Sequence, residues 1–276
     1  MSAIGEANRW AAEVWKVAVN SWETREQDYN YRRFVASPAM RAALKLVDPL
    51  NHGIFLDLGC GDGSELGHIR GTLLRRGNSG IFFGFDFQES LIEAARNRKW
   101  IGGPIQTSFD HGNLANLVRK HNLVSKVDRT FSTFLLQELA DADACFKLSA
   151  ECLKKGGLGI FLFLHPAFGT AMRAKGAVRI NEKLVSKSWR WAAEYPIVEE
   201  GGRTFYVPYF HRELADYIEL AGRHFSEIKV LGRQPTANAV RKCEREHRSP
   251  FYDHPGNVYF PEIVTIPSSL IFLVRK

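Results

Sequence analysis

The sequence has no long hydrophobic run and no closely paired cysteines, and both absences narrow the class of protein. No apolar stretch approaches the roughly 18 residues that a membrane-spanning helix requires. The N-terminus, MSAIGEANRW, lacks the basic start and apolar segment of a secretory signal. The four cysteines are scattered, unlike those of a zinc site or a disulfide framework: Cys60, Cys145, Cys152 and Cys243. We therefore expect a cytoplasmic protein with reduced thiols, no metal site and no membrane partner.

Internal repeats, low-complexity segments and a strongly basic region are missing too. The hydrophobic fraction of 45% and the charged fraction of 24% are those of an ordinary folded domain. The formal net charge is +7, but the densest basic stretch, RKCEREHRSP at 241–250, is interrupted by Glu244 and Glu246. That mixture is more typical of a solvated surface than of a nucleic-acid site. We therefore do not expect a nucleic-acid partner.

Short apolar runs alternate with polar, helix-like segments, which is the pattern of βα units around a parallel sheet. The runs lie at 54–58, 80–86, 126–132 and 158–164, with a weaker one at 104–108. The helical segments between them begin near Ser64, Glu89, His111 and Ala142. Two later runs, 226–232 and 268–276, have no obvious crossover helix between them, so the last strand is expected to be antiparallel. The fold class is therefore α/β, with a mostly parallel sheet and helices on both faces.

Two segments do not fit this pattern, and we expect them to cover the carboxyl ends of the strands, where open α/β sheets bind ligands. One is the N-terminal segment, rich in tryptophan and tyrosine, whose aromatic spacing fits a packed helix as well as a substrate wall. The other is the insert that begins at Pro166. We expect one domain over 1–276, divided into an N-terminal helical cap (1–50), a cofactor-binding core (51–165), a substrate lid (166–210) and a C-terminal part of the core (211–276).

A glycine-rich turn follows the first strand, with the sequence Asp57-Leu58-Gly59-Cys60-Gly61-Asp62-Gly63. It has no lysine and does not match the G-x-G-x-x-G spacing, which argues against a phosphate cradle or a dinucleotide site. Asp57 and Asp62 place negative charge beside the turn, while the helix after Gly63 offers free N–H groups to a carboxylate. A ligand with both an ammonium and a carboxylate group satisfies these demands, and S-adenosylmethionine is such a ligand.

A nucleoside also needs a carboxylate for its ribose hydroxyl groups. Asp86 ends the next strand, GIFFGFD, and stands in the right place, although an aspartate there also fits a helix N-cap. After the third strand, Ser108-Phe109-Asp110 offers a carboxylate for an adenine amino group, although Asp-His-Gly also reads as a turn.

These features together resemble the class I S-adenosylmethionine-dependent methyltransferases over nearly the whole chain. The motifs that carry the resemblance are DLGCGDG at 57–63, FGFDFQESLIEAAR at 83–96, SFD at 108–110, DRTFSTFLLQELAD at 128–141 and ECLKKGGLGIFLFLHPAF at 151–168. The family implies a Rossmann-like, seven-stranded sheet with a reversed last strand. It also implies S-adenosylmethionine as cofactor and S-adenosylhomocysteine as product.

The resemblance assigns cofactor contacts to particular residues of this sequence. Asp57 would lie near the ammonium group, Asp86 at the ribose and Asp110 at the adenine. The remaining expected contacts are Gly59, Gly61, Asp62, Gly63, Phe87, Gln88, Ser108, Phe109, Ser132, Thr133 and Phe134.

The segments HPAF at 165–168 and YFHRELADYI at 209–218 resemble a subgroup that acts mostly on small molecules, so a small-molecule acceptor is expected. A general base is needed only for a protonated acceptor. His165 is the first candidate, followed by Tyr31, His211 and Glu138, although both histidines also fit structural roles. An RNA methyltransferase and a non-catalytic cofactor-binding protein remain alternatives. The acceptor atom is open, and so is the choice between monomer and homodimer.

Overall fold

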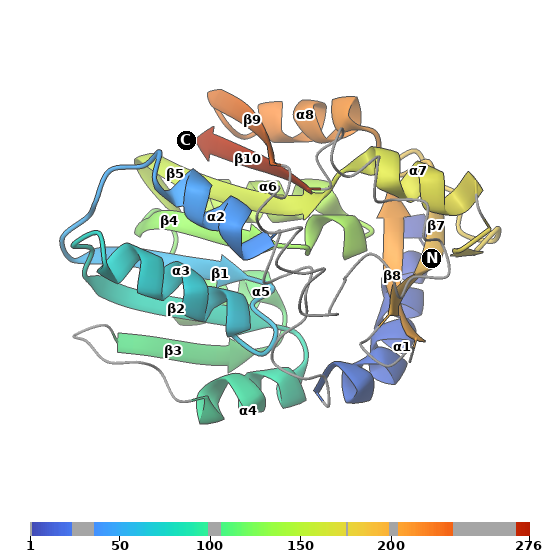
Figure 1. Cartoon of the computed structure of the whole chain (residues 1–276), viewed down its shortest axis with the longest axis horizontal. Helices are drawn as coiled ribbons and strands as arrows, with labels where there is room; N and C mark the ends of the chain where they lie inside the picture. The colour runs from blue at the N-terminus through green and yellow to red at the C-terminus, as the bar shows by residue number, and fades with distance from the viewer. Residues whose placement is uncertain (1, 24–35, 99–105, 175, 199–203, 234–268) are drawn as a thin grey trace, which may run out of the picture.

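The computed structural model describes residues 2–23, 36–98, 106–174, 176–198, 204–233 and 269–276. Its main element is a seven-stranded sheet in the order β3-β2-β1-β4-β5-β10-β9 (Figure 1). The strands are β1 (Gly53–Leu58), β2 (Gly80–Asp86), β3 (Gln106–His111), β4 (Val127–Thr133), β5 (Leu153–Leu164), β9 (Glu227–Arg233) and β10 (Ser269–Arg275).

The direction of the strands confirms the expected topology. Strand β1 is parallel to β2 and β4, and the outer pairs β2–β3 and β4–β5 are parallel as well. Strand β10 is antiparallel to both neighbours, β5 and β9, so the last strand is reversed. The parallel strands therefore end at one common edge, which positions the candidate site.

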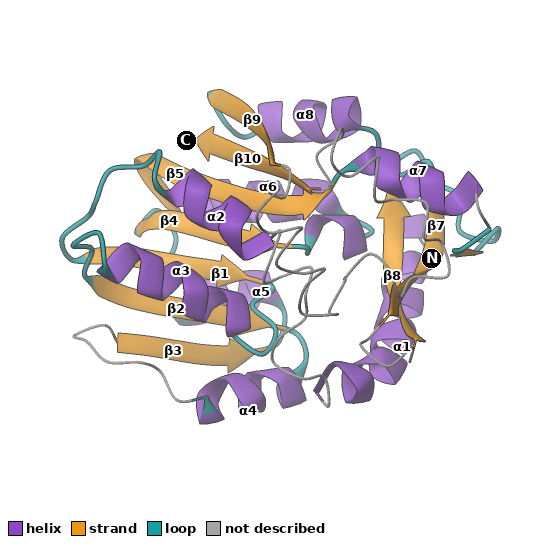
Figure 2. Ribbon diagram, in the orientation of Figure 1, coloured by secondary structure: helices purple, strands orange, loops and turns teal. Residues whose placement is uncertain are grey.

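Helices cover both faces of this sheet because successive strand residues point to opposite sides (Figure 2). Phe55 packs in one buried cluster with helices α2 (Ser37–Leu44), α3 (Ser64–Leu74) and α4 (Glu89–Asn97). Its neighbour Leu56 packs in another with α5 (Leu114–Lys120), α6 (Ala142–Cys152) and α8 (Leu214–Gly222).

The helix starts expected at Ser64, Glu89 and Ala142 are correct. The start expected near His111 is wrong, because β3 continues to His111 and α5 begins at Leu114. The side chain of Asn113 caps α5 by accepting a hydrogen bond from the backbone N–H of Asn116 at 3.1 Å. A local cap that satisfies a free N–H therefore determines where this helix begins.

A second, smaller sheet lies beyond the carboxyl ends of the parallel strands (Figure 1). Its order is β6-β7-β8, built from β6 (Arg179–Ile180), β7 (Trp191–Val198) and β8 (Thr204–His211). Helix α1 (Ala3–Glu23) packs on it, with Trp10 edge-on to Phe210 at 5.6 Å between ring centroids. Helix α7 (Pro166–Ala174) connects β5 to this sheet.

The described part of the chain has no helix long and apolar enough to cross a membrane. Cys60, Cys145 and Cys152 are buried free thiols, and Cys243 lies outside the described residues.

Candidate functional site

The glycine-rich turn between β1 and α3 has an unusual backbone conformation. Gly59, Gly61 and Gly63 have φ values of 74°, 53° and 73°, the left-handed region that glycine adopts most readily. The backbone N–H groups of Gly59 and Cys60 donate to the carbonyl of Phe85 at 2.8 and 3.1 Å, which fastens the turn to β2. A Cβ on Gly61 would meet no heavy atom within 4 Å, so the turn borders open space here.

Asp86 connects this turn to the end of β2. Its carboxylate accepts hydrogen bonds from the backbone N–H groups of Gly61 at 2.9 Å and Gln88 at 3.0 Å. The side chain is 7% exposed, and burial raises the pKa of Asp86, with a smaller contribution from the like charge of Asp62. The carboxylate therefore shapes the loop and also faces the site.

Asp62 is held inside the turn. Its carboxylate accepts from the Ser64 hydroxyl at 2.6 Å and forms an ion pair with Arg98 at 2.7 Å. These contacts make Asp62 a support of the loop conformation.

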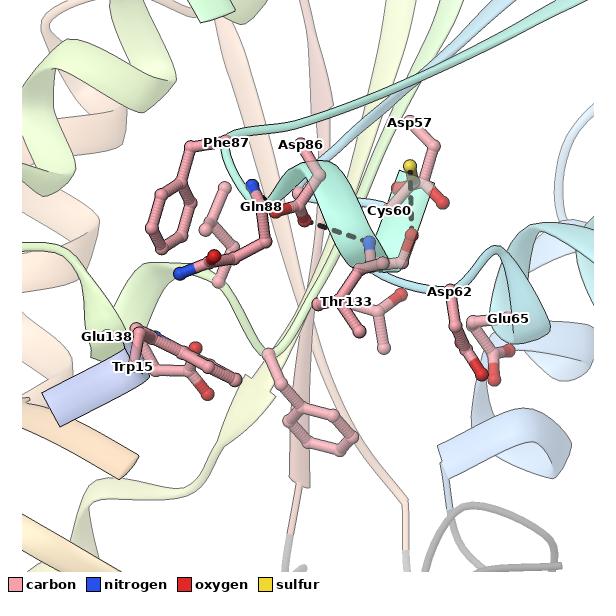
Figure 3. A pocket seen from close by; sticks show the side chains of 15 residues that line it. Trp15, Asp57, Cys60, Asp62, Glu65, Asp86, Phe87, Gln88, Thr133 and Glu138 are labelled. Carbon is pink, nitrogen blue, oxygen red and sulfur yellow. Dashed lines mark hydrogen bonds between the residues drawn. The ribbon is translucent and has the colours of Figure 1, made fainter. Parts of the chain in front are cut away.

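Two cavities, joined by a shared part of their lining, lie along the turn and the strand ends, and Figure 3 shows the residues around the smaller one. The smaller, about 70 Å³, includes Asp57, Gly61, Glu65, Thr133 and Phe134 in its lining. The larger, about 410 Å³, extends toward α1, α5 and α6. Both are lined by the same six residues: Trp15, Gly59, Asp86, Phe87, Leu135 and Glu138. Asp86 therefore lies where the two cavities meet.

The smaller cavity contains polar atoms that no described protein group satisfies. Thr133 Oγ1 and Glu65 Oε1 are buried without a hydrogen-bond partner among the described residues. The other carboxylate oxygen of Glu65 accepts from the Ser37 hydroxyl at 2.8 Å. Since buried polar groups normally have partners, these two atoms are available to water or to a polar ligand in the cavity.

Glu138 enters the cavity wall from the short helix η2 (Leu136–Glu138), which follows β4. The surrounding protein encloses its carboxyl group, although part of the side chain remains exposed to the cavity. Burial raises the pKa of Glu138 well above its ordinary value, and the nearby charge of Asp86 raises it further. A hydrogen bond from Trp15 opposes this shift.

The two histidines among the base candidates lie elsewhere. His165 Nδ1 accepts from the backbone N–H of Ala167 at 3.1 Å, so this ring caps the start of α7. The ring of His211 is buried in β8, stacked on Trp191 at 4.6 Å, and burial lowers its pKa to about 4. Neither histidine lines the two cavities. Tyr31 lies outside the described residues.

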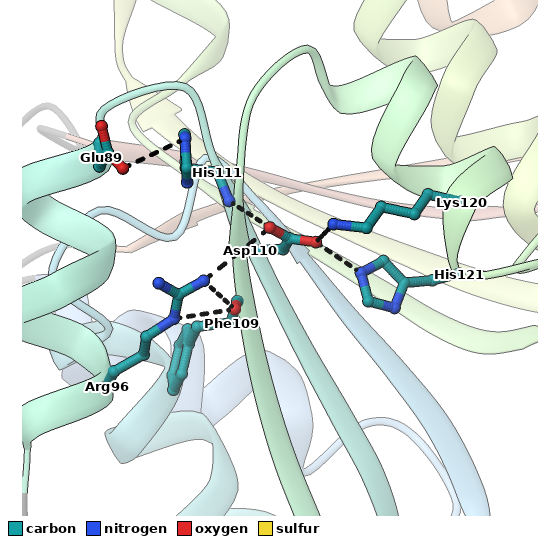
Figure 4. Close-up of polar contacts among 7 residues, drawn as sticks. All are labelled: Glu89, Arg96, Phe109, Asp110, His111, Lys120 and His121. Carbon is teal, nitrogen blue, oxygen red and sulfur yellow. Dashed lines mark hydrogen bonds and ion pairs between the residues drawn. The ribbon is translucent and has the colours of Figure 1, made fainter.

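Asp110 does not line the cavities either. Its carboxylate accepts from Lys120 at 2.6 Å and contacts His121 at 2.9 Å (Figure 4). Burial alone would raise the pKa of Asp110, but these hydrogen bonds outweigh it and hold the pKa at about 2. The larger cavity is lined instead by the following residues Gly112 and Asn113, which sequence reasoning missed.

Some of the remaining expected cofactor contacts line the cavities, and others do not. Cavity lining includes Asp57, Asp62, Phe87, Gln88, Thr133 and Phe134. Ser108, Phe109 and Ser132 are not part of it, and neither is the side-chain-free Gly63, which precedes α3. Glu65 and Leu135 were also missed, because nothing in their local sequence distinguishes them from other helix and loop residues.

The comparisons with known proteins agree with this fold. A family model described as "Methyltransferase domain" matches residues 51–202. An S-adenosylmethionine-dependent methyltransferase from Mesorhizobium loti is 18% identical, with a TM-score of 0.54 over 87% of this chain and 96% of its own. A putative one from Listeria monocytogenes is 18% identical, with a TM-score of 0.57 over 88% and 98%.

A possible histamine N-methyltransferase from Thermotoga maritima is 15% identical, with a TM-score of 0.54 over 96% of this chain and 98% of its own. No curated protein matches the sequence. These structures share the fold, and the family model covers more than half of the chain. The chain therefore belongs to the methyltransferase-domain family and is a class I S-adenosylmethionine-dependent methyltransferase.

Proposed function

We propose that this enzyme methylates a small molecule and that the two joined cavities hold its cofactor. The observation that carries the proposal is the position of Asp86 where the smaller and larger cavities meet. S-adenosylmethionine also has two parts, an amino-acid end and a nucleoside end, joined at the ribose. A ribose beside Asp86 would direct the two ends into the two cavities.

The residues present fit this ligand. The smaller cavity offers Asp57 to the ammonium group and the unsatisfied hydroxyl of Thr133 to the amino-acid end. Gly61 leaves the space that a close ligand needs. In the larger cavity, we place the adenine against Phe87 and the backbone at Gly112 rather than at Asp110, whose carboxylate already has partners.

The bound cofactor supplies the electrophilic methyl group, so the protein's task is placement. Orienting an acceptor toward that methyl group contributes on the order of 7–11 kcal/mol. Of the base candidates that the structure describes, Glu138 alone lines the cavities. Burial raises its pKa, which makes its carboxylate a stronger base. A positioned general base contributes roughly 10²- to 10⁴-fold to the rate.

Several observations support a small acceptor. The described residues that line the cavities include no lysine, arginine or histidine, and phosphate-rich polymers usually require such residues. One structural neighbour is the Haemonchus contortus phosphoethanolamine N-methyltransferase 2, solved with phosphomonomethylethanolamine and S-adenosylhomocysteine. Another is a geranyl diphosphate methyltransferase. The basic stretch at 241–250, on which an RNA acceptor would depend, lies outside the described residues.

Calorimetry on the Asp86→Ala variant tests the cofactor site. We expect S-adenosylhomocysteine to bind the wild type and to bind the variant at least about tenfold more weakly, since ribose hydroxyl groups lose a buried acceptor. The matched control is Asp110→Asn, which changes a carboxylate on the adjacent strand outside the cavities and should bind normally. Equal binding by wild type and Asp86→Ala would refute the proposed site.

A second experiment tests the acceptor class. Purified enzyme is incubated with S-adenosylmethionine and either a pool of small metabolites or total RNA, and S-adenosylhomocysteine is measured. We expect production with the metabolite pool. S-adenosylhomocysteine production with RNA but not with the metabolite pool would contradict a small-molecule acceptor. No S-adenosylhomocysteine with either substrate would favour a non-catalytic binding protein.

A further inference from the structure

Arg212 follows β8 directly and is 1% exposed, so its charge is buried. Its guanidinium points across to the loop between β4 and α6. One terminal nitrogen, Nη2, donates to the backbone carbonyls of Leu139 at 2.9 Å and Ala140 at 2.7 Å. The other, Nη1, donates to the carbonyl of Leu136 at 3.4 Å. A side chain next to the small sheet thus holds the loop that carries Glu138.

The same guanidinium also holds the small sheet and the loop before β7. Its Nε donates to the carbonyl of Ser188 at 2.8 Å, and Nη1 donates to the carbonyl of Phe210 at 3.4 Å. Tyr217 of α8 adds a hydrogen bond, and its ring centroid lies 5.9 Å from the guanidinium carbon. Arg212 therefore joins three segments that are far apart in the sequence.

The chemistry of arginine explains why this residue type stands here. A planar guanidinium carries five N–H donors in a rigid fork, so it can satisfy several carbonyls that converge from different segments. Its partners in the described part of the chain are those carbonyls and the Tyr217 hydroxyl, and no carboxylate in that part forms an ion pair with it. A lysine, with one compact ammonium group, would not span the same set.

Packing and a few hydrogen bonds also hold this loop: Leu136 and Ala140 are buried, and Trp15 donates a hydrogen bond to Glu138. The backbone N–H of Glu138 donates to the carbonyl of Leu135 at 2.9 Å, a contact within the loop itself. The Gln137 side chain accepts from the backbone N–H of Leu164 at the long distance of 3.5 Å. Because Glu138 and Leu139 line the larger cavity, a shift of this loop would change the cavity wall.

We propose that Arg212 is a positioning residue that sets Glu138 and Leu139 in the wall of the cofactor cavity from outside that cavity. The inference rests on the proposed function, because it takes the cavity to be the cofactor site. It also gives the small sheet a second role, since that sheet supports the loop as well as covering the strand ends.

The test uses Arg212→Lys in the full chain, with S-adenosylmethionine binding measured by calorimetry. We expect binding about tenfold weaker than in the wild type, equivalent to about 1.4 kcal/mol. Arg190→Lys is the matched control, because the same change is made two residues after Ser188 at an exposed ion pair with Asp216. It should bind within about twofold of the wild type, the range expected for an exposed ion pair.

A double-mutant cycle separates positioning from general stability. If Arg212 acts through Glu138, adding Arg212→Lys to Glu138→Gln should weaken binding by less than about threefold, because the two effects overlap. An equal loss in both backgrounds would overturn the proposal. Should Arg212→Lys fail to fold, Tyr217→Phe removes only one hydroxyl partner of Arg212 and should weaken binding in the same direction. Wild-type binding by that variant would then overturn it.

Hydrogen exchange supplies a readout that needs no ligand. In Arg212→Lys, or in Tyr217→Phe if the first variant does not fold, amides of 135–141 should exchange faster while those of β1 and β2 remain as in the wild type. Unchanged exchange in 135–141 would also overturn the proposal. A wild-type chain that binds no S-adenosylmethionine would refute the proposed function, and exchange would then still decide whether Arg212 holds the loop.

Discussion

At the residue scale, a few buried polar groups determine what the cavity can bind. Asp86 and Glu138 lie on a shared cavity wall, and the pKa of each is raised mainly by burial. Their proximity to one another raises the pKa of Glu138 further. A cationic ligand between them would relieve this repulsion, which suits the positive sulfonium of the cofactor better than the neutral sulfur of its product.

Glu138→Gln should stabilise the folded protein at high pH. A carboxyl group whose folded pKa is raised contributes stability that is fully present below its ordinary pKa, here 4.5, and lost as the pH rises through the folded value. Glutamine stays neutral and can still accept from Trp15. We expect a melting temperature about 2–4 °C above wild type at pH 8, with no difference near pH 4.

The exposed Glu93 on α4 supplies the control, since Glu93→Gln should change the melting temperature at neither pH. A Glu138→Gln variant that melts at the wild-type temperature, or below it, at pH 8 would contradict the expected cost of burying this carboxylate.

At the element scale, the turn between β1 and α3 has glycines in left-handed backbone conformations, and the same turn borders the cavity. Gly59 and Gly61 have similar φ values, but a Cβ would meet different surroundings at each position. On Gly59 it would lie 2.9 Å from the Leu135 side chain, whereas on Gly61 it would enter open space. Alanine substitutions at Gly59 and Gly61 should therefore have different effects on folding stability and on ligand binding.

Gly61→Ala should fold with a modest loss of about 1–2 kcal/mol for the left-handed backbone, and should bind S-adenosylhomocysteine at least about tenfold more weakly because its methyl group occupies the cavity. Gly59→Ala should be the less stable of the two, since its methyl group also displaces Leu135. Urea denaturation and calorimetry measure both effects.

Gly77→Ala is the matched control, because Gly77 has a φ of 78° and open surroundings but does not line either cavity. Gly77→Ala should lose a similar amount of folding stability and should bind S-adenosylhomocysteine as tightly as the wild type. Weakened binding by this control would mean that loop strain, and not an occupied cavity, explains the result for Gly61→Ala.

At the scale of the whole molecule, the cavities lie between the strand ends of the main sheet and a cover, helix α1, which packs on the small sheet. Trp15 packs with Phe205 and Val207 of β8 on one side and lines both cavities on the other. It is therefore both a packing residue and part of a cavity wall. A ligand bound in the cavities would contact both this cover and the main sheet, and local unfolding of the two would become rarer.

Saturating S-adenosylhomocysteine should slow hydrogen exchange in α1 and in the loop 135–141 by about tenfold or more, because the ligand binds the folded cavity wall and not its locally unfolded states. Strands β9 and β10 lie at the other edge of the sheet and should exchange as before. Uniform slowing across all strands would indicate global stabilisation instead, and would contradict a ligand seated under α1.

Much of this fold and part of the site follow from local sequence. A buried strand, a turn that needs glycine and a helix start are each determined by neighbouring residues, so β1, β2 and the helix at Ser64 were predictable. The same holds for Asp57 and Asp86, because a residue at the end of a parallel strand reaches the common edge whatever packs around it.

Only the tertiary structure decided which of the remaining side chains face the cavity. Asp110 meets Lys120 and His121, and His211 stacks on Trp191, through contacts between elements that the local sequence does not specify. Trp15 and Arg212 acquire their places because α1 and the small sheet pack across the strand ends. Side-chain direction depends on these distant partners, and that is the physical reason why spacing along the chain could not predict it.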